Sequence, residues 1–280
     1  MTDAERFAEA RPRLLRLAYS ELGDLGEAED VVQEAWLRLE RVDAQAIENL
    51  DGWLTTVVAR LALDRLRSAR ARRETYVGPW LPEPLVSDDP ADRVTLDESV
   101  SYALLTVLEQ LSPPERTAFV LHDVFDVPFG EVAEVVGRTP EAVRQLASRA
   151  RRHVRGEHPR FPASDDEHDR AVRAFASAVG EGDLSSLVAV LDPDVVWTSD
   201  GGGLATAARK PLRGAARVGR GWAALTARLV REPFEITLNG RLGLVVSSED
   251  GHRAALSFVV SDGRITRIDA IRNPEKLRRL

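Results

Sequence analysis

The chain has 280 residues, of which 44% are hydrophobic and 30% charged, so the length allows two or more domains and the composition is that of an ordinary soluble protein. No apolar run approaches the roughly 20 residues that cross a bilayer, and the N-terminal segment lacks the apolar core of a signal peptide, so we expect a cytoplasmic protein without a membrane partner. The absence of cysteine excludes disulfides, thiol nucleophiles and thiolate metal sites.

The net charge of −7 is distributed unevenly along the chain. Residues 60–73 and residues 138–160 each carry a local charge of +5, whereas residues 74–98 between them carry −6. Nucleic-acid binding depends on the local field rather than on the net charge. Two basic segments joined by an acidic one therefore suggest a protein that contacts two separated DNA segments.

Helical periodicity dominates the first 73 residues. Residues 28–41 carry one apolar stripe, formed by Val31, Val32, Ala35, Trp36 and Leu39. A second helix is expected from about Trp53 to Arg73, with Arg60, Asp64 and Arg67 on its outer face. Residues 77–92 contain four prolines, which remove backbone donors and disfavour helix, so we interpret this segment as a linker.

A helix-turn-helix is expected after residue 128. Residues 129–136 form a short amphipathic pattern, Gly137 is a left-handed stop, and Thr139 and Pro140 are suited to start the next helix. That helix turns apolar side chains inward and leaves a polar, basic face outside, made of Arg144, Gln145, Ser148, Arg149 and Arg152. Such a face either reads DNA in the major groove or is only solvated.

The last 110 residues change from helical to mixed patterns. Amphipathic helices are expected within residues 172–191, and strands at residues 195–198, 234–239, 242–246 and 255–260. Hairpin turns are expected at residues 249–251 and 261–263. These patterns predict an α+β domain in which helices pack on a curved antiparallel sheet.

Three segments resemble the extracytoplasmic-function (ECF) sigma factors of bacterial RNA polymerase, in that family's order and spacing: EAEDVVQEAWLRLER at 27–41, residues 51–74, and residues 111–154. The resemblance implies a multidomain protein with a helical sigma region 2 at 1–75, a proline-rich acidic linker at 76–95, and a region 4 helix-turn-helix at 96–160. It implies promoter-specific initiation of transcription with core polymerase and promoter DNA as partners, and no enzymatic activity.

The resemblance also assigns roles to residues. The first segment would contact the clamp helices of the largest polymerase subunit through Asp30, Gln33, Glu34 and Arg38. The second would read the −10 element, with Trp53, Arg60, Asp64, Arg65, Arg67 and Arg70 as its residues. The third would read the −35 element through Arg144, Gln145, Ser148, Arg149 and Arg152.

Two of the −10 assignments have alternatives, and one position departs from the family. Trp53 is either a stacking surface for a base or part of the core, and Asp64 orients Arg60 or Arg67 more plausibly than it touches anionic DNA. Leu61 stands where many relatives carry Asn, which puts a base contact from that position in doubt.

The final segment, residues 165–280, resembles a SnoaL-like cone fold fused to one sigma subgroup. Three strings carry this resemblance: WLPEP at 80–84, DGGG at 200–203 and NPEKL at 273–277. They imply an intramolecular regulator in place of an anti-sigma protein, built on Trp80, Leu81, Pro82, Pro84, Asp200, Gly201, Gly202, Gly203, Asn273, Pro274, Glu275, Lys276 and Leu277. The alternatives are a flexible hairpin for DGGG and a terminal cap for NPEKL.

Other function classes remain open at this point. Cone folds also host isomerases and hydrolases that use Asp or His in an apolar cavity, for which the candidates are Asp200, His252, Asp262 and Asp269. Asp262 lies in a turn and Asp200 in a glycine loop, which argues against catalysis. His153 and His158 have no ligand cluster, so neither a metal nor another cofactor is expected. The remaining alternative is a helix-turn-helix regulator with a ligand-binding or isomerase-like C-terminal domain.

Overall fold

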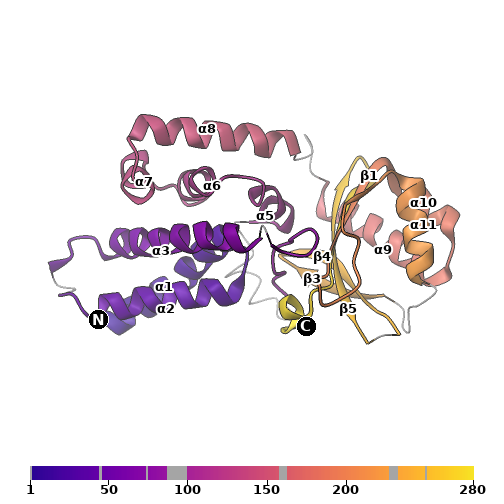
Figure 1. The fold of residues 1–280 in the computed structure, drawn as a ribbon, viewed down its shortest axis with the longest axis horizontal. Helices are drawn as coiled ribbons and strands as arrows, with labels where there is room; N and C mark the ends of the chain where they lie inside the picture. The colour runs from indigo at the N-terminus through magenta and orange to yellow at the C-terminus, as the bar shows by residue number, and fades with distance from the viewer. Residues whose placement is uncertain are drawn as a thin grey trace. The chain divides into compact units, whose positions relative to one another are not determined.

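The structure is a computed structural model that describes residues 2–43, 46–73, 75–86, 100–157, 163–226, 233–249 and 251–280 (Figure 1). The chain divides into two compact units, which we treat separately. The first unit comprises Met1–Glu74, Val94–Val100 and Leu104–Glu157, and the second comprises Thr75–Arg93, Ser101–Ala103 and His158–Leu280. Among the described residues, no helix is both long enough and apolar enough to cross a membrane.

The first unit begins with three helices, α1 (Asp3–Leu22), α2 (Leu25–Leu39) and α3 (Leu50–Arg73). Local sequence sets their ends: Thr2 and Glu5 form a capping box at the start of α1, and Gly23 ends it in the left-handed conformation with φ of 66°. Asp24 then caps α2 by accepting a hydrogen bond from the Glu27 amide. The expected helices at 28–41 and 53–73 are both confirmed, each beginning about three residues earlier than predicted.

The helix-turn-helix is confirmed by the elements that follow: α5 (Tyr102–Leu108), α6 (Pro113–Phe119), the π-helical turn η2 (Val120–Val124), α7 (Phe129–Val136) and α8 (Pro140–Glu157). Gly137 ends α7 with φ of 71°, and the Ala142 amide donates to Thr139 Oγ1 at 3.3 Å. Val143, Ala147 and Ala150 are buried on the inner face of α8.

A buried polar junction joins α1 to α6 inside the first unit. The Arg116 guanidinium, which is 1% exposed, donates from Nη2 to the Ser20 carbonyl at 3.1 Å and contacts the Glu109 carboxylate. Thr117 Oγ1 donates to the fully buried Glu21 carboxylate at 3.0 Å. Burial raises the pKa of Glu21 to about 7, against the opposing effects of Arg116 and Thr117. This junction connects the expected region 2 to the expected region 4.

The second unit contains one sheet of six strands within the described residues, in the order β2-β1-β6-β5-β4-β3. The strands are β1 (Leu191–Asp200), β2 (Leu212–Arg213), β3 (Phe234–Leu238), β4 (Arg241–Ser247), β5 (Arg253–Ser261) and β6 (Arg264–Ile271). The expectation of a fully antiparallel sheet is wrong for one pairing, because β1 runs parallel to β6. The turn at 261–263 is confirmed as the β5–β6 hairpin, with positive φ at Asp262 and Gly263, whereas Asp250 of the other turn lies outside the described residues.

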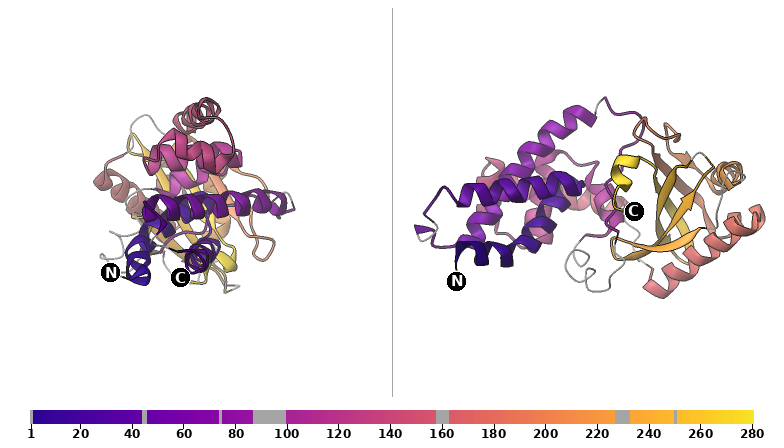
Figure 2. Two further views of the ribbon diagram at one scale, coloured as in Figure 1. Left: turned by 90° about the vertical axis from the view of Figure 1, so that its left-hand side faces the viewer. Right: turned by 90° about the horizontal axis from the view of Figure 1, so that it is seen from below.

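Apolar side chains are buried on both faces of this sheet. Helices α9 (Asp165–Glu181), α10 (Leu184–Ala189) and α11 (Ala215–Thr226) cover one face (Figures 1 and 2). Their core centres on an aromatic cluster of Phe175, Trp197, Trp222 and Phe258, with ring centroids about 5 Å apart. A smaller cluster on Leu238, Ala255 and Ile271 includes Leu81 and Tyr102, and Leu277 of the short helix η3 (Pro274–Leu277) packs against it.

Candidate functional site

The four residues expected to bind polymerase share one region of α2. Asp30, Gln33 and Arg38 are exposed, and Glu34 is partly exposed. Glu34 pairs with Arg38 at 3.1 Å, and Asp30 pairs with Arg65 of α3 at 3.4 Å. Exposed pairs of this kind contribute little to stability, about 0–1 kcal/mol, so both can be exchanged for contacts with another protein.

Helix α3 presents the expected −10 residues in several different environments. Arg60 is exposed and donates to the Glu134 carbonyl of α7 at 3.2 Å, so this guanidinium touches the helix-turn-helix. Asp64 pairs with Arg67 at 3.2 Å, which fits the orienting role expected of this carboxylate. Trp53 and Leu61 are partly buried, and the Arg70 side chain lies outside the described residues.

The outer face of α8 places all five expected −35 residues in solvent. Arg144 pairs with Glu141 at 3.2 Å, and its guanidinium lies 5.4 Å from the centre of the Phe129 ring. Arg149 donates to Glu115 at 2.7 Å. Burial alone would raise the pKa of Glu115, but hydrogen bonds from Arg149 and Ser112 lower it. The two arginines are therefore held by neighbouring side chains while they remain exposed.

The three strings WLPEP, DGGG and NPEKL meet around one carboxylate in the second unit. Residues 75–86, which we call the strap, lie against the end of β1, where the Asp200 carboxylate is fully buried. That carboxylate accepts hydrogen bonds from Tyr76 Oη at 2.7 Å, from the Leu81 amide at 2.9 Å and from Lys276 Nζ at 2.7 Å. Asp200 thus joins the strap to η3.

Lys276 is the cation of this cluster and is only 7% exposed. Its Nζ also donates to the Leu81 carbonyl, and it lies 3.9 Å from the centre of the Trp80 ring and 5.2 Å from that of Tyr76. A cation in a desolvated position over aromatic rings gains about 2 kcal/mol or more. We call Tyr76, Trp80, Leu81, Asp200 and Lys276 the lysine cage.

Tyr76 completes the cage as a neutral hydrogen-bond donor. Burial, together with its hydrogen bond to Asp200, raises the pKa of the Tyr76 phenol well above its ordinary value. Asn273 Nδ2 donates to the same phenol oxygen at 2.9 Å. The sequence analysis did not single out Tyr76, although it lies four residues before Trp80.

The glycines after Asp200 allow this close approach. A Cβ atom on Gly202, where φ is 60°, would lie 2.4 Å from Asn273 Nδ2, and one on Gly201 would lie 2.2 Å from the Ala205 carbonyl oxygen. The first residue of this loop is buried and its glycines pack against η3 and the strap, which favours a packed loop over the alternative of a flexible hairpin.

The strap continues along the sheet to the end of β3. The Leu85 backbone amide donates to Asn239 Oδ1 at 3.0 Å, and the Asn239 backbone amide donates to the Leu85 carbonyl at 2.9 Å. Val86 forms an antiparallel bridge with Leu238. Tyr102 Oη donates to the Pro82 carbonyl at 2.9 Å. The proline-rich segment is thus packed on the second unit through residue 86, and residues 87–99 lie outside the described residues.

The residues considered for catalysis or metal binding have different surroundings. Asp269 is buried beside Arg267 at 2.8 Å, and burial raises its pKa against the effect of that arginine. Asp262 is exposed in the β5–β6 turn, and His153 contacts Gln110 at 3.3 Å. Among the described residues, no group of three His, Asp or Glu side chains is placed to hold a metal ion, and His158 lies outside them.

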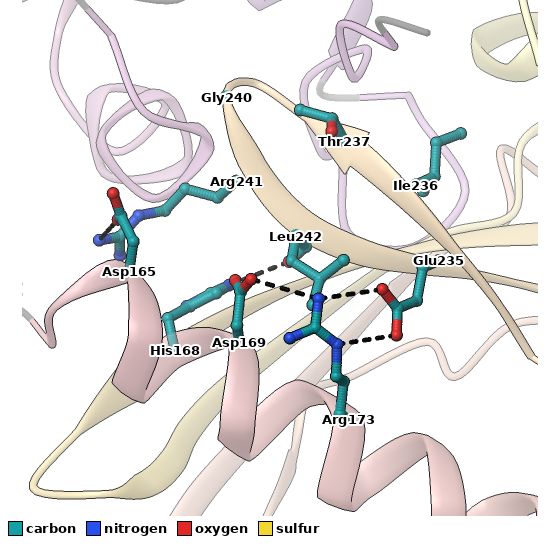
Figure 3. Close-up of a pocket in the computed structure, with 10 residues that line it drawn as sticks. All are labelled: Asp165, His168, Asp169, Arg173, Glu235, Ile236, Thr237, Gly240, Arg241 and Leu242. Atoms are coloured by element: carbon teal, nitrogen blue, oxygen red, sulfur yellow. Dashed lines mark hydrogen bonds and ion pairs between the residues drawn. The ribbon is translucent and has the colours of Figure 1, made fainter.

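A polar groove of about 440 Å³ lies between α9 and the β3–β4 hairpin (Figure 3). Its charged side chains pair with one another: Arg173 binds Glu235 through two hydrogen bonds of 3.0 and 3.2 Å, and Arg241 binds Asp165 at 3.0 Å. Burial lowers the pKa of His168, whose Nε2 lies 2.9 Å from the Leu242 carbonyl. The charges of the groove are satisfied internally, so it offers little attraction to a charged ligand.

Comparisons with known proteins identify two family matches in the helical part of the chain. Residues 7–72 match the family "Sigma-70 region 2" and residues 101–154 match "Sigma-70, region 4". The ECF RNA polymerase sigma factor SigJ of Mycobacterium tuberculosis is 41% identical, over 98% of this chain and 93% of that protein. The probable ECF RNA polymerase sigma factor SigI of the same species is 38% identical, over 95% of this chain and 92% of that protein. The crystal structure of the M. tuberculosis SigJ superposes with a TM-score of 0.81 and 38% identity, covering 99% of this chain and 98% of that one.

Proposed function

The chain belongs to the ECF RNA polymerase sigma factors, and we propose that within this family it divides its contacts among α2, α3 and α8. In this proposal the outer face of α2 binds core polymerase at its clamp helices, α3 binds the −10 element, and α8 binds the −35 element. The observation that carries it is the exposure of all five polar residues on α8 above a buried apolar stripe. A pull-down with core polymerase followed by transcription in vitro tests it.

We expect the triple substitution Asp30→Ala, Gln33→Ala and Glu34→Ala to weaken binding to core polymerase by about tenfold or more, equivalent to about 1.4 kcal/mol. The three side chains lie at the surface, where a substitution changes the free energy of unfolding by only about 0.5 kcal/mol, so we expect the fold to be retained. Co-purification and binding titration with core polymerase measure the effect. The double substitution Asp166→Ala and Glu181→Ala, at exposed positions of α9, is the control. Equal binding by the triple variant and the wild type would remove α2 from the interface.

We expect Arg144→Ala to reduce promoter binding by about 1–3 kcal/mol and to relax base preference at particular −35 positions. Arg144 lies in the N-terminal part of α8, where helices in the major groove place their base-reading residues. Selection from a randomised −35 library measures the preference, and Arg149→Ala, whose guanidinium is held by Glu115, is compared in parallel. If both variants lose affinity evenly across sequences with a shallower salt dependence, the two arginines hold phosphates instead.

We further propose that residues 163–280 of the second unit regulate this sigma factor from within the chain, by binding the strap, and that they perform no covalent chemistry. The strap belongs to the chain segment that connects α3 to α5. Whether the strap is bound or released therefore limits how far the region 2 and region 4 helices can separate. The hydrogen bonds that the buried Asp200 and Lys276 make to Tyr76 and Leu81 of the strap support this proposal, because they exist only while the strap is bound and so favour that state over a released one. In this role the second unit takes the place of a separate anti-sigma protein.

A further inference from the structure

Basic side chains are concentrated on one stretch of the second unit. Residues 201–231 contain seven Lys or Arg residues and no acidic residue, in a chain whose net charge is −7. Five of these lie within the described residues and all five are exposed: Arg209, Lys210, Arg213, Arg217 and Arg220. We call these five side chains the basic strip. It runs from the loop before β2, through β2, to the first two turns of α11.

The charges of the basic strip have no counter-charge among the described residues. Within the described part of the chain, none of the five side chains has a hydrogen-bond or ion-pair partner, and the carboxylates on the neighbouring part of β1, Asp192 and Asp194, form no ion pair with them. Other arginines of the same unit are paired, among them Arg173 with Glu235 and Arg267 with Asp269. Arg170 of α9 and Arg264 of β6 are also exposed without a partner among the described residues, but the strip differs in carrying five such charges within residues 209–220.

The placement of these charges is unfavourable for the isolated fold. Arg217 lies in the first turn of α11, which contains no acidic residue, so its charge opposes the positive end of the helix dipole. Arg217 and Arg220 are three residues apart on the same exposed helix face, where like charges repel. An anionic partner bound across the strip would relieve both effects.

We propose that the basic strip binds the sugar-phosphate backbone of DNA. A guanidinium group matches the geometry of a phosphate, and the strip is lined by charge rather than by the aromatic and apolar anchors typical of protein interfaces. DNA is the polyanion that a sigma factor meets at every promoter. The contact would be independent of sequence, because phosphates carry no base information.

The basic strip lies next to the strap, so DNA bound to the strip would also lie close to the strap. The Cα atom of Arg209 lies 4.0 Å from the position that a Cβ atom on Gly78 would occupy, so the strip begins directly beside the strap. DNA held on the strip would lie next to the segment that the lysine cage binds. The second unit would then be anchored to promoter DNA rather than remain a free appendage.

The double substitution Arg217→Gln and Arg220→Gln tests the proposal in holoenzyme reconstituted from the full chain and core polymerase. Neutralising two phosphate contacts should reduce the salt dependence of DNA binding, with the slope of log K against log salt falling in magnitude by about 1.8. The loss should be equal on promoter and scrambled duplexes. The control is Arg170→Gln with Arg264→Gln, which removes the same charge from exposed positions of the same unit. An unchanged slope, or an equal change in the control, overturns the proposal.

A photo-cross-linking amino acid at exposed position Ala216 provides the second readout, in the same holoenzyme bound to promoter DNA. Cross-links to DNA support the proposal. Cross-links to polymerase alone would show that the strip meets an acidic protein surface, and their absence would show a solvated face; either result overturns the assignment to DNA. Matched thermal unfolding of the double variant and the wild type establishes that the fold is retained.

Discussion

Replacing Lys276 with alanine is expected to release the strap from the rest of the second unit and to raise transcription in vitro by about 5- to 150-fold at an unchanged promoter. The substitution leaves the Asp200 carboxylate fully buried without its cation. Removing one partner of a buried pair costs about 3–5 kcal/mol, which is enough to shift an equilibrium between two states that differ by a few kcal/mol. Only the part of this cost that differs between the bound and released states of the strap shifts the equilibrium, and a difference of about 1–3 kcal/mol gives the stated 5- to 150-fold range.

Three measurements separate this effect from general unfolding. Hydrogen exchange should accelerate within residues 75–86 while the amides of β5 and β6 remain protected, because those strands lie inside the sheet. Trp80→Ala should act in the same direction, since it removes the ring that lies 3.9 Å from Lys276 Nζ. Arg278→Ala is the matched control, because its pair with Glu275 is exposed. If Lys276→Ala, Trp80→Ala and the wild type support equal transcription, the strap does not regulate the protein.

The junction between α1 and α6 is expected to weaken as the pH rises from about 5 to about 8. Glu21 has a pKa of about 7 in the folded protein against an ordinary value of 4.5, so the folded state binds its proton more tightly than the unfolded state does. The stabilisation is therefore fully present below pH 4.5 and is lost as the pH rises through 7. A shift of this size corresponds to about 3 kcal/mol, at 1.36 kcal/mol for each pH unit.

The substitution Glu21→Gln tests this expectation because glutamine keeps an oxygen that can accept the Thr117 hydrogen bond but does not titrate. Hydrogen exchange of α6 amides across the pH series, corrected for intrinsic exchange, should show a falling protection factor in the wild type and a flat one in the variant. Glu131→Gln, at an exposed position of α7, should retain the wild-type dependence. A flat profile in the wild type would mean that the buried carboxylate does not control the junction.

Local sequence signals account for the parts of the fold that were predicted well. Gly137, Thr139 and Pro140 define the turn of the helix-turn-helix through their own backbone preferences, and the stripe of α8 follows from residues spaced within one helix. The same is true of the polar outer faces of α2 and α8. These features depend on neighbours in the chain, which a single sequence contains.

The features that the sequence analysis missed depend on contacts between distant residues. Strand β6 carries charged residues that obscure its pattern, because Arg267 and the buried Asp269 pair with each other on one face. Its parallel pairing with β1 joins residues about 70 positions apart. The Arg116 bond to Ser20 spans 96 positions, and Asn273 reaches Tyr76 over 197. Hydrophobic periodicity contains no information about such buried polar partners.

The route of the chain through the second unit has a consequence for recombination between sigma factors. The strap and residues 101–103 precede the helix-turn-helix in the sequence, yet they fold with residues from the other side of it. A C-terminal fragment beginning near residue 163 would expose Leu238, Ala255 and Ile271, which Leu81 and Tyr102 otherwise help to cover. Moving this unit onto another sigma factor therefore requires the strap and residues 101–103 to be transferred together with the C-terminal residues from about 163 onward. The sequences on the two sides of the helix-turn-helix should therefore be inherited together.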